Sequence, residues 1–569
     1  MASEDDALDT KTADAQLASD IADNSLVDAE ATSKAADSAA DGAHNEDEEG
    51  EEDEVDDEAP AEAGAEAPSK AKKKRKPKKK KPKSTAVEGD QGTAVASAAT
   101  TGQAPVAAND SEGQSMPAKD IQQLLQQLAL SQPSSQKREG KDPSEYKFWN
   151  TQPVPKFQEP NLLQTTTGTD LKEGAILPDN ICKASITPEP GKLLEGFEWC
   201  EVDLTNEEEL REFYELLYNH YVEDTDGSFR FNYSTNFLRW ALMPPGWKKD
   251  WHIGVRAKPQ SSDTSKKGKL VASICGVPVS LRVRSNVLKA TEINFLAIHR
   301  KLRSKRLAPV LIKEVTRRCY QHNIFQALYT AGTLLPTPIS TCRYYHRSLD
   351  WPHLYKTGFS HLPPRMTEQQ MARKYWLPSK PSTKGLRPMK REDILAVKDL
   401  LERYLERFHL RPEFPEEDVE HYLMSEASKD VVWSYVVEQD GKVTDFISYY
   451  LLESTVLKVN AKNDTIRAAY LYYYATETAF AGGQAALKAR LDELVHDVLV
   501  LAKKDGFHVF NALTLLENPL FLKDQKFEPG DGKLNYYLFN WRTALLAGGV
   551  DEKNQLDQNK MGGVGVVML

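Results

Sequence analysis

The aromatic residues of this chain are confined to its last three quarters. All 50 Phe, Trp and Tyr residues follow position 145, and the first of them is Tyr146. Residues 1–140 are instead rich in Ala, Asp, Glu, Ser and Lys, so they cannot bury enough apolar surface to offset the entropy of ordering a chain. The sequence therefore predicts a disordered tail over residues 1–140 and a folded body from residue 141 onward.

Charge divides the chain at the same place. The net charge is −11, but residues 1–140 carry 30 acidic and 16 basic residues, which leaves 54 acidic and 57 basic residues in the body. Residues 46–58 hold 11 acidic residues in 13 positions, and residues 70–83, from Lys70 to Lys83, hold 11 basic residues in 14. Such a basic block is typical of a nuclear signal or an RNA-binding arm, or else it solvates the tail and pairs with the acidic block. A short amphipathic helix is predicted at 117–132.

Cysteine usage and hydropathy indicate a cytosolic protein. The five cysteines, at positions 182, 200, 275, 319 and 342, lie far apart and form no C-x-x-C pair, so we expect reduced thiols and no metal site. The acidic start Met-Ala-Ser-Glu-Asp-Asp does not have the pattern of a signal peptide, and no stretch approaches the length of a membrane span.

The body has an α/β pattern that occurs twice. The first half predicts a helix at 205–221 opened by a capping box at Thr205, strands at 251–256, 269–283 and 289–299, a helix at 307–322 and a strand at 324–330. The second half predicts a helix at 393–408, strands at 431–438, 442–452 and 468–476, a helix at 485–504 and a strand at 508–513. A hairpin turn is predicted at 439–441. A linker rich in Pro, Lys and Ser near 362–386 separates the halves, which we place at 141–365 and 366–569. The fold class is therefore α/β, of the mixed kind.

One segment, 292–309, joins a strand to a helix through a basic turn. Ile293, Phe295 and Ala297 alternate along the strand, five cationic residues follow within Arg300–Arg306, and helical spacing begins at Leu307. Such a junction directs unpaired backbone N–H groups and the positive end of a helix at one spot, which predicts a site for a diphosphate. A charge run by itself more often marks a solvated turn.

This segment resembles the N-myristoyltransferases, a variant of the GNAT acetyltransferase fold. The diphosphate loop of that fold normally reads Arg/Gln-x-x-Gly-x-Gly/Ala, whereas this chain has Arg303 to Ala308 with Arg306 at the glycine position, as in the myristoyltransferase subfamily. Further similar blocks lie at 146–154, 221–224, 329–332, 341–348, 530–532 and 562–569. The resemblance covers 141–569 and none of the tail. It implies two pseudo-symmetric GNAT-like halves.

The resemblance implies transfer of myristate from myristoyl-CoA, as acyl-donor substrate, to the N-terminal glycine of nascent proteins, with no further cofactor. The acyl-CoA contacts it implies are Tyr146, Lys147, Phe148, Trp149, Phe295, Leu296, Ala297, Ile298, Arg303, Ser304, Lys305, Arg306, Leu307 and Ala308. Without the resemblance, packing of residues 146–149 onto the core is the favoured interpretation.

Two catalytic roles follow from the same resemblance. The backbone N–H groups of Phe295 and Leu296 supply the oxyanion donors, unless both bond within the sheet. The carboxylate of Leu569 is the base, and an apolar end flexed by Gly562, Gly563 and Gly565 suits burial that raises the pKa of that carboxylate. A frayed hydrophobic terminus is the ordinary alternative.

The peptide groove that the resemblance implies is aromatic and narrow, so that it admits glycine and rejects larger residues. Acidic Asp224 and Asp531 favour basic peptides, although His346 alone would more often be a core histidine. The full set is Tyr221, Val222, Asp224, Phe229, Phe231, Tyr233, Asn294, Thr330, Gly332, Tyr344, His346, Ser454, Tyr470, Asp531 and Gly532. The alternatives are another GNAT-type N-acyltransferase and an RNA- or ribosome-binding adaptor acting through residues 70–83. We expect a monomer.

Overall fold

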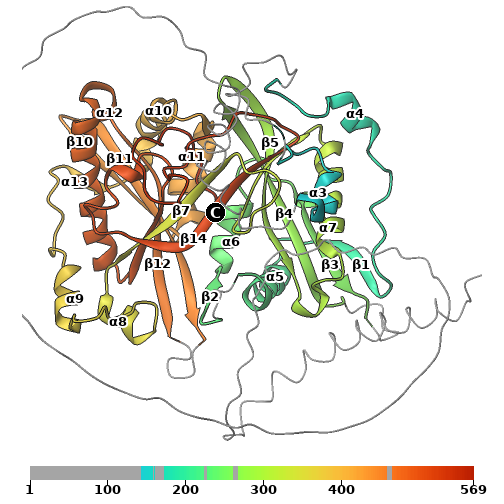
Figure 1. The fold of residues 1–569 in the computed structure, drawn as a ribbon, viewed down its shortest axis with the longest axis horizontal. Helices are drawn as coiled ribbons and strands as arrows, with labels where there is room; N and C mark the ends of the chain where they lie inside the picture. Colours follow the sequence, from blue (N-terminus) through green and yellow to red (C-terminus); the bar gives the residue numbers. More distant parts are fainter. Residues whose placement is uncertain (1–142, 158, 160–171, 223–226, 260–266, 458–463) are drawn as a thin grey trace, which may run out of the picture. The chain divides into compact units, whose positions relative to one another are not determined.

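A computed structural model of the chain describes residues 143–157, 159, 172–222, 227–259, 267–457 and 464–569 (Figure 1). The predicted tail, the helix expected at 117–132 and Asp224 lie outside the described residues. The described part is a mixed α/β structure, as predicted. In that part no helix is long and apolar enough to cross a membrane. Its five cysteines carry free thiols.

The first half of the described chain contains the predicted succession of helix, three strands, helix and strand. Two short helices come first, α3 (Lys147–Asn150) and α4 (Asp179–Ala184). The half then comprises β1 (Phe197–Glu201), α5 (Glu207–His220), β2 (Phe229–Asn232), α6 (Thr235–Leu242), β3 (His252–Ala257), β4 (Leu270–Val283), β5 (Asn286–Ile298), α7 (Leu307–Gln321), β6 (Gln326–Ala331) and β7 (Ser340–Ser348). Sequence periodicity missed β1, β2, α6 and β7.

The second half repeats that succession. After α8 (Trp351–Lys356) and α9 (Glu368–Lys374) it comprises β8 (Leu386–Pro388), α10 (Ile394–Leu405), β9 (Leu410–Pro412), α11 (Glu416–Met424), β10 (Val432–Gln439), β11 (Lys442–Val456), β12 (Thr465–Thr476), α12 (Thr478–Ala481), α13 (Gly483–Lys504), β13 (Val509–Leu513) and β14 (Glu528–Phe539). The hairpin turn between β10 and β11 is confirmed, with Asp440 and Gly441 both at positive φ, as a two-residue loop requires. The boundary between 365 and 366 stays a prediction.

Both halves share one sheet whose strand order reads alike from its two ends. The order is β1-β3-β4-β5-β6-β14-β7-β13-β12-β11-β10-β8. Counting inward, β1 corresponds to β8, β3 to β10, β4 to β11, β5 to β12 and β6 to β13. The last strands exchange places, because β14 lies beside β6 and β7 lies beside β13 (Figure 1). The exchange ties the halves into a single sheet.

The sheet contains two parallel strand pairs, and each pair parts after three residues. Residues 290–292 of β5 pair with 326–328 of β6, and residues 468–470 of β12 pair with 509–511 of β13. Both openings lie toward the carboxyl ends of the strands, where ligands bind in open α/β sheets.

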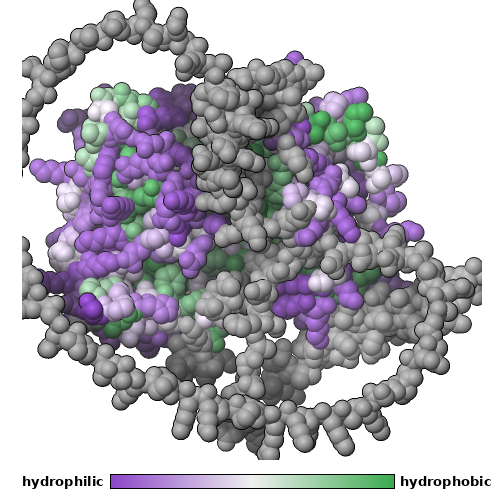
Figure 2. Space-filling model, viewed as in Figure 1, coloured by the Kyte–Doolittle hydropathy of each residue, from purple (hydrophilic) through white to green (hydrophobic). Residues whose placement is uncertain are grey.

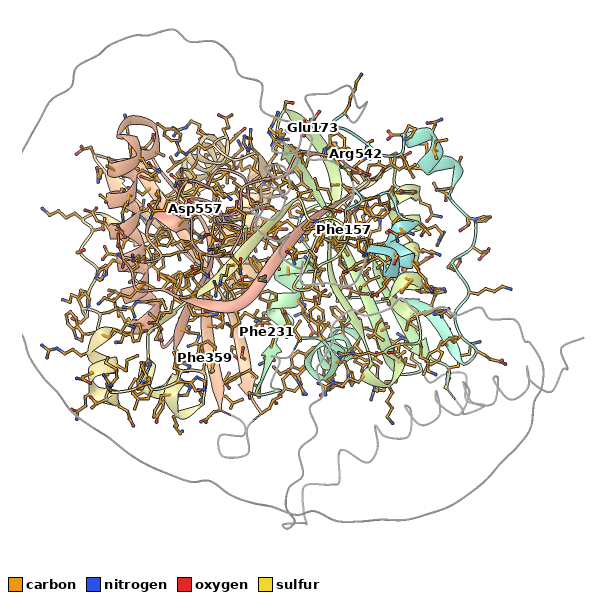
Figure 3. All side chains as sticks on the ribbon, viewed as in Figure 1. Phe157, Glu173, Phe231, Phe359, Arg542 and Asp557 are labelled. Carbon is orange, nitrogen blue, oxygen red and sulfur yellow. The ribbon has the colours of Figure 1, made fainter. Side chains whose placement is uncertain are left out.

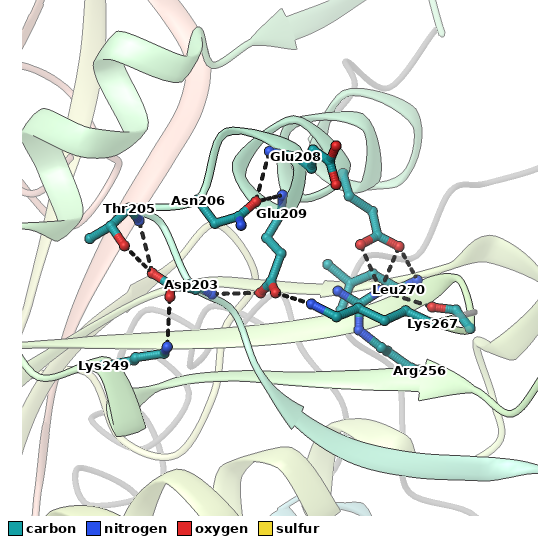
Figure 4. A network of polar contacts seen from close by, with 11 residues as sticks. Asp203, Thr205, Asn206, Glu208, Glu209, Lys249, Arg256, Lys267 and Leu270 are labelled. Atoms are coloured by element: carbon teal, nitrogen blue, oxygen red, sulfur yellow. Dashed lines mark hydrogen bonds and ion pairs between the residues drawn. The ribbon is translucent and has the colours of Figure 1, made fainter. Parts of the chain in front are cut away.

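The N-terminus of α5 differs from the sequence prediction. Asn206 is the cap, and its side-chain oxygen accepts from the N–H groups of Glu208 and Glu209 at 2.9 and 3.1 Å. The predicted cap, Thr205, is wrong because its hydroxyl donates to Asp203 at 2.6 Å (Figure 4). Asp203 therefore holds the turn before the helix, and the helix starts one residue later.

Two hydrophobic clusters position the elements around the openings. The largest joins α5, α6, α10 and α13 to the sheet, and a second packs α7 against β3 and β4. Polar side chains cover most of the coloured part of the face in Figure 2, over both halves.

Candidate active site

A β-bulge in β5 marks the first opening. Ser273 pairs with Ala297 and Cys275 with Asn294, so Phe295 and Leu296 together face the single residue Ile274. Phe295 has a φ of 55°, a left-handed conformation that costs a non-glycine residue about 1–3 kcal/mol. Such strain gathers at functional sites, where it directs backbone groups out of the ladder.

Contacts around Phe295 hold the bulge in place. The Ser273 hydroxyl donates to the Phe295 carbonyl at 3.0 Å, and the Phe295 side chain is 1% exposed. Its ring meets those of Tyr233, Tyr221 and Phe213, with centroids 5.3, 5.8 and 6.2 Å away. The strained residue is thus fixed on both its backbone and its side chain.

The basic turn after β5 contains two left-handed residues. Ser304 has a φ of 64° and Arg306 a φ of 57°, and Arg306 is the N-cap of α7 without a side-chain cap. Arg303 donates to the carbonyl of His220 at 3.0 Å, which fixes the turn to the end of α5. The first N–H groups of α7, at Leu307 and Ala308, have no partner within their helix. Ala297 and Ile298 are the last residues of β5, before this turn, and Lys305 lies within the turn.

The aromatic segment formed by Tyr146 and α3 packs on β6. Trp149 stacks on Tyr329 with centroids 5.5 Å apart, and the hydroxyl of Tyr146 donates to the Leu334 carbonyl at 2.8 Å. Phe148 lies with Lys313 5.9 Å above its ring, and Lys147 is exposed. These contacts place the four predicted residues together. For Trp149 the contact is packing onto the core, which is what the interpretation without the resemblance predicts.

The chain's last residues are threaded into the core and do not fray. Val564, Val566, Val567 and Met568 are 1–7% exposed, and Leu569 is partly buried. Figure 1 marks the C-terminal end amid the strands of the sheet. The alternative of a frayed terminus is therefore wrong.

Hydrogen bonds fix this path between β12 and β13. The N–H of Val567 donates to the Tyr473 hydroxyl at 3.0 Å, and the N–H of Leu516 donates to the Val564 carbonyl at 2.9 Å. A Cβ on Gly563 would lie 2.1 Å from the Ala547 oxygen. Gly562 has a φ of 81°, which a glycine adopts without strain, and Gly563 has no room for a side chain.

Three groove residues from the first half, Tyr221, Phe231 and Tyr233, form an aromatic cluster beside the bulge. The ring centroids of Tyr221 and Tyr233 are 5.7 Å apart, and those of Phe231 and Tyr233 are 5.8 Å apart. Phe229 meets Phe359 at 5.8 Å, and Figure 3 labels Phe231 and Phe359 on the same side of the molecule. The carbonyl of Val222 accepts from Phe231.

Other groove residues lie on β7 of the first half and on β11, β12 and β14 of the second half. Tyr344 meets Tyr470 edge to face at 6.4 Å, and burial raises the pKa of Tyr470 to about 12. Ser454 pairs with Phe231 between β11 and β2, which connects this set to the first-half cluster. The predicted groove is thus contributed by both halves.

His346 is held in its neutral form. Its Nδ1 lies 2.7 Å from the Oδ1 of Asn511, an acceptor, so that nitrogen carries the proton. Burial lowers the pKa of His346, against the opposing charge of Asp531. A Cβ on Gly530 would lie 2.3 Å from the His346 Nε2, so the 530–532 loop of β14 covers the ring closely.

The remaining predicted residues sit at the edges of the first opening. Asn294 donates to Glu292 at 2.8 Å, and Thr330 of β6 pairs with Tyr536. The carbonyl of Gly332 accepts from Asn535 at 3.2 Å, and Gly532 lies against Tyr344.

Sequence reasoning missed Ser273, Asn511 and Glu292. Ser273 and Asn511 act by orienting another residue, and no motif marks such a role. Glu292 was readable as an acidic residue within an apolar strand, the kind of group that is rarely buried without a purpose.

Comparisons with known proteins agree with this geometry. Residues 177–342 match the family "Myristoyl-CoA:protein N-myristoyltransferase, N-terminal domain", and residues 356–567 match its C-terminal domain. The glycylpeptide N-tetradecanoyltransferase of Aspergillus fumigatus is 55% identical over 81% of this chain and 90% of its own length, and that of Candida albicans is 48% identical over 80% and 98%.

A solved structure shares the fold. The crystal structure of Saccharomyces cerevisiae N-myristoyltransferase with bound myristoyl-CoA superimposes with a TM-score of 0.70 at 47% identity, over 75% of this chain and all of that one. The chain therefore belongs to the myristoyl-CoA:protein N-myristoyltransferase family.

Proposed function

We propose that this chain is a glycylpeptide N-tetradecanoyltransferase, an acyltransferase that moves a fourteen-carbon acyl group from its CoA thioester to the amine of an N-terminal glycine. The observation that carries the proposal is the strained bulge at Phe295, set directly before the basic turn and the uncapped start of α7. The identities of the acyl donor and of the acceptor are inferred from the family and from the similar proteins.

The basic turn would hold the diphosphate of the acyl donor. Arg303, Lys305 and Arg306 supply positive charge, while the N–H groups of Leu307 and Ala308 point along the helix axis toward the bound anion. Residues 146–149 would cover the remainder of the nucleotide. Each methylene of the acyl chain that leaves water contributes about 0.8 kcal/mol, so a long apolar pocket gives tight binding.

The bulge would stabilise the oxyanion. As the amine nitrogen bonds to the thioester carbon, the carbonyl oxygen becomes negative, and the N–H groups of Phe295 and Leu296 donate to it. Loss of one such donor typically costs about 3–4 kcal/mol in the transition state. The C–S bond then breaks and the CoA thiolate leaves.

The carboxylate of Leu569 would take the proton from the glycine ammonium. An α-ammonium has a pKa near 7.7–8.0, so most of it is charged at neutral pH and needs a base. The buried path of Val564–Met568 supports this role, because it brings the terminus into an apolar interior where carboxylates are stronger bases.

The aromatic cluster and the β14 loop would select the peptide. Tyr221, Tyr233 and Tyr344 narrow the passage at the first residue, and Asp531 favours cationic residues farther along. Asn294, Thr330, Gly332, His346, Ser454, Tyr470 and Gly532 complete the proposed lining, and Asp224 is expected to add a second negative charge.

The tail would bring the enzyme to nascent chains. We propose a cytoplasmic monomer whose residues 70–83 bind ribosomal RNA, on the evidence of 11 basic residues in 14 positions. Replacing the lysines of 72–81 with glutamine should reduce salt-sensitive cosedimentation with ribosomes and leave peptide kinetics unchanged. Unchanged cosedimentation at low salt would contradict this role.

A single assay separates this function from its rivals. Acyl transfer to a Gly-initiated peptide is measured with CoA thioesters of increasing acyl length, from acetyl to beyond myristoyl, with and without the tail. The proposal predicts a maximum near fourteen carbons. A maximum at acetyl-CoA would indicate another GNAT-type enzyme, and no transfer with retained RNA binding would indicate an adaptor.

A further inference from the structure

The proposed reaction releases one proton to solvent in each cycle. The glycine enters as an ammonium and ends as an amide, so its nitrogen loses two protons. One of them leaves with the CoA thiol, whose pKa near 8.5 keeps it protonated at neutral pH. The other is taken by the base. That base must return to its charged form before the next cycle, so the proton needs a path out of the interior.

A cavity lies directly beside the base. It is lined by Leu569, Val566 and Val567 from the C-terminal segment, and by residues of β4, β5, β12 and α11. The part of this cavity that can hold water-sized molecules has a volume of about 30 Å³. By that measure one water molecule needs about 10–15 Å³, so the cavity has room for one or two waters beside the terminus.

Glu292 faces this cavity from β5, three residues before the bulge. Its side chain accepts a hydrogen bond from Asn294 at 2.8 Å, and no cation pairs with it among the described residues. Burial raises the pKa of Glu292 to about 7, against the opposing hydrogen bond from Asn294. Tyr422, Tyr472 and Tyr473 surround the same cavity.

Asp418 lines the cavity from α11 and is half-buried. Burial raises its pKa to about 6, and the neighbouring charge of Glu417 adds to that shift. Glu292, Asp418 and Tyr422 all line this one cavity, and the charges of both carboxyl groups raise the pKa of Tyr422 beyond the effect of burial. A third carboxylate in the lining, Glu413, is instead ion-paired with Arg282 at 2.7 Å.

We propose that this cavity is the proton exit of the acyl transfer, and that Glu292 and then Asp418 relay the proton from the Leu569 carboxylate to solvent. The O–H bond on Leu569 breaks as one forms on Glu292 through water, and the same exchange follows at Asp418 and at bulk water. The proposal rests on the proposed function, because it needs the terminal carboxylate as base.

The groups that face Glu292 and Asp418 are compatible with a carboxyl pair that is neutral or carries one negative charge. Asn294 donates to Glu292, the tyrosine hydroxyls can pass protons, and Arg282 is occupied by Glu413. Burial raises the pKa of both carboxyl groups toward neutrality, so each can take up a proton and release it again near pH 7.

Single-turnover and steady-state kinetics test the relay on the full chain. Amide formation is followed by rapid quench and proton release by a pH indicator in weak buffer, for wild type, Glu292→Gln and Asp418→Asn. In each variant the first turnover should form amide at close to the wild-type rate, since Leu569 starts deprotonated. Proton release should lag behind it, and kcat should fall about ten- to a hundredfold with KM unchanged.

Two controls make the outcome decisive. Glu413→Gln changes a carboxylate in the same lining that is already paired, and its kinetics should equal those of wild type. A small diffusible acid-base such as imidazole should restore kcat in Glu292→Gln, which a folding defect would not allow. Thermal unfolding of each variant confirms that it is folded.

The failures are distinguishable. Proton release in step with the amide and wild-type kcat in both variants would overturn the relay while leaving the acyltransferase intact. Loss of the first turnover in Glu292→Gln would make Glu292 the base itself and overturn the relay. Absence of amide in wild type would overturn the proposed function.

Discussion

The two openings in the sheet are built alike and filled differently. Each follows a three-residue parallel pairing, and each lies next to a bulge in which two residues face one. In β5 the bulge is Phe295 and Leu296 opposite Ile274, and in β12 it is Tyr472 and Tyr473 opposite Ser448. The first opening adjoins the basic turn, and the second receives the chain's own C-terminal segment.

The difference follows from small changes of sequence. The turn after β5 has five cations within residues 300–306, whereas residues 476–483 after β12 contain one acidic residue and no Lys or Arg. At the second bulge the N–H of Tyr473 donates to the Ser448 hydroxyl at 3.2 Å. Ser448 and the apolar C-terminal segment thus fill the second opening. The first opening has a strained residue and a basic turn, which are suited to an anionic ligand.

The largest effect should come from the segment that fills the second opening. Deleting residues 565–569, or adding residues after Leu569, removes or displaces the proposed base, which should lower the single-turnover rate about a hundred- to ten-thousandfold. Myristoyl-CoA affinity, measured by titration, should change little.

Leu569→Ala is the matched control, because it keeps the terminal carboxylate and should retain most activity. A wild-type rate in the extended chain would assign the base to a side chain.

Gly563→Ala should disturb the same path sterically. Its new Cβ would lie 2.1 Å from backbone oxygen of Ala547, so the backbone must shift and unfolding free energy should fall by about 2–4 kcal/mol. Urea unfolding checks this, with Gly191→Ala as control, since a Cβ there lies 3.8 Å from Val310. Equal midpoints for both variants would contradict the close approach.

Paired serine substitutions sharpen the comparison of the two bulges. Ser273→Ala and Ser448→Ala each remove a buried hydroxyl from a bulge, which should lower stability by about 1–3 kcal/mol. Only Ser273→Ala should also lower kcat, because only the first bulge directs oxyanion donors. Equal kcat in the two variants, measured at saturating substrates, would remove the functional difference.

Acid should destabilise the first half more than the second. Burial lowers the pKa of His252 and His299 to about 4 and of His220 to about 3, whereas in the second half only His508 falls as low, to about 4. The unfolded histidines bind protons below about 6.5 while the folded ones remain neutral, so stability falls from pH 6.5 toward pH 4.

Urea midpoints measured across this range should drop, and His252→Gln should flatten the dependence. His252 is the best probe because it is fully buried against Trp247. An unchanged slope in that variant would show that His252 is not among the groups that titrate on unfolding.

The smallest effect should come from removing residues 1–140. All aromatic residues follow position 145, so a chain starting at Lys141 should keep its peptide kcat/KM within about twofold. A large loss would move the boundary of the catalytic unit toward the N-terminus.

Much of the fold was predictable because its elements carry local signals. The helices at α5, α7, α10 and α13 and the strands β3, β4, β5 and β10–β13 were predicted within a few residues. The strands β1, β2, β7 and β14 were not predicted. Both β1 and β2 are short, β7 is polar, and β14 has Pro and Gly near its start. Their positions depend on partners far away in the sequence, such as β2 on β11.

The candidate site divides in the same way. Residue types and spacing predicted the anion-binding turn and the glycine-flexed terminus, because local backbone chemistry requires both. The geometry of the groove came from the resemblance, and its two-sided construction needed strand pairing to be seen.

By itself, the sequence determined where the folded body begins, that its pattern occurs twice and that a basic turn follows one strand. Only the tertiary structure decided that the C-terminus enters the core, that Phe295 is strained and that Glu292 and Asp418 share a cavity. Composition and periodicity act between neighbours in the chain. These three features instead depend on contacts between residues over a hundred positions apart, or on a bulge that a single cross-strand register defines.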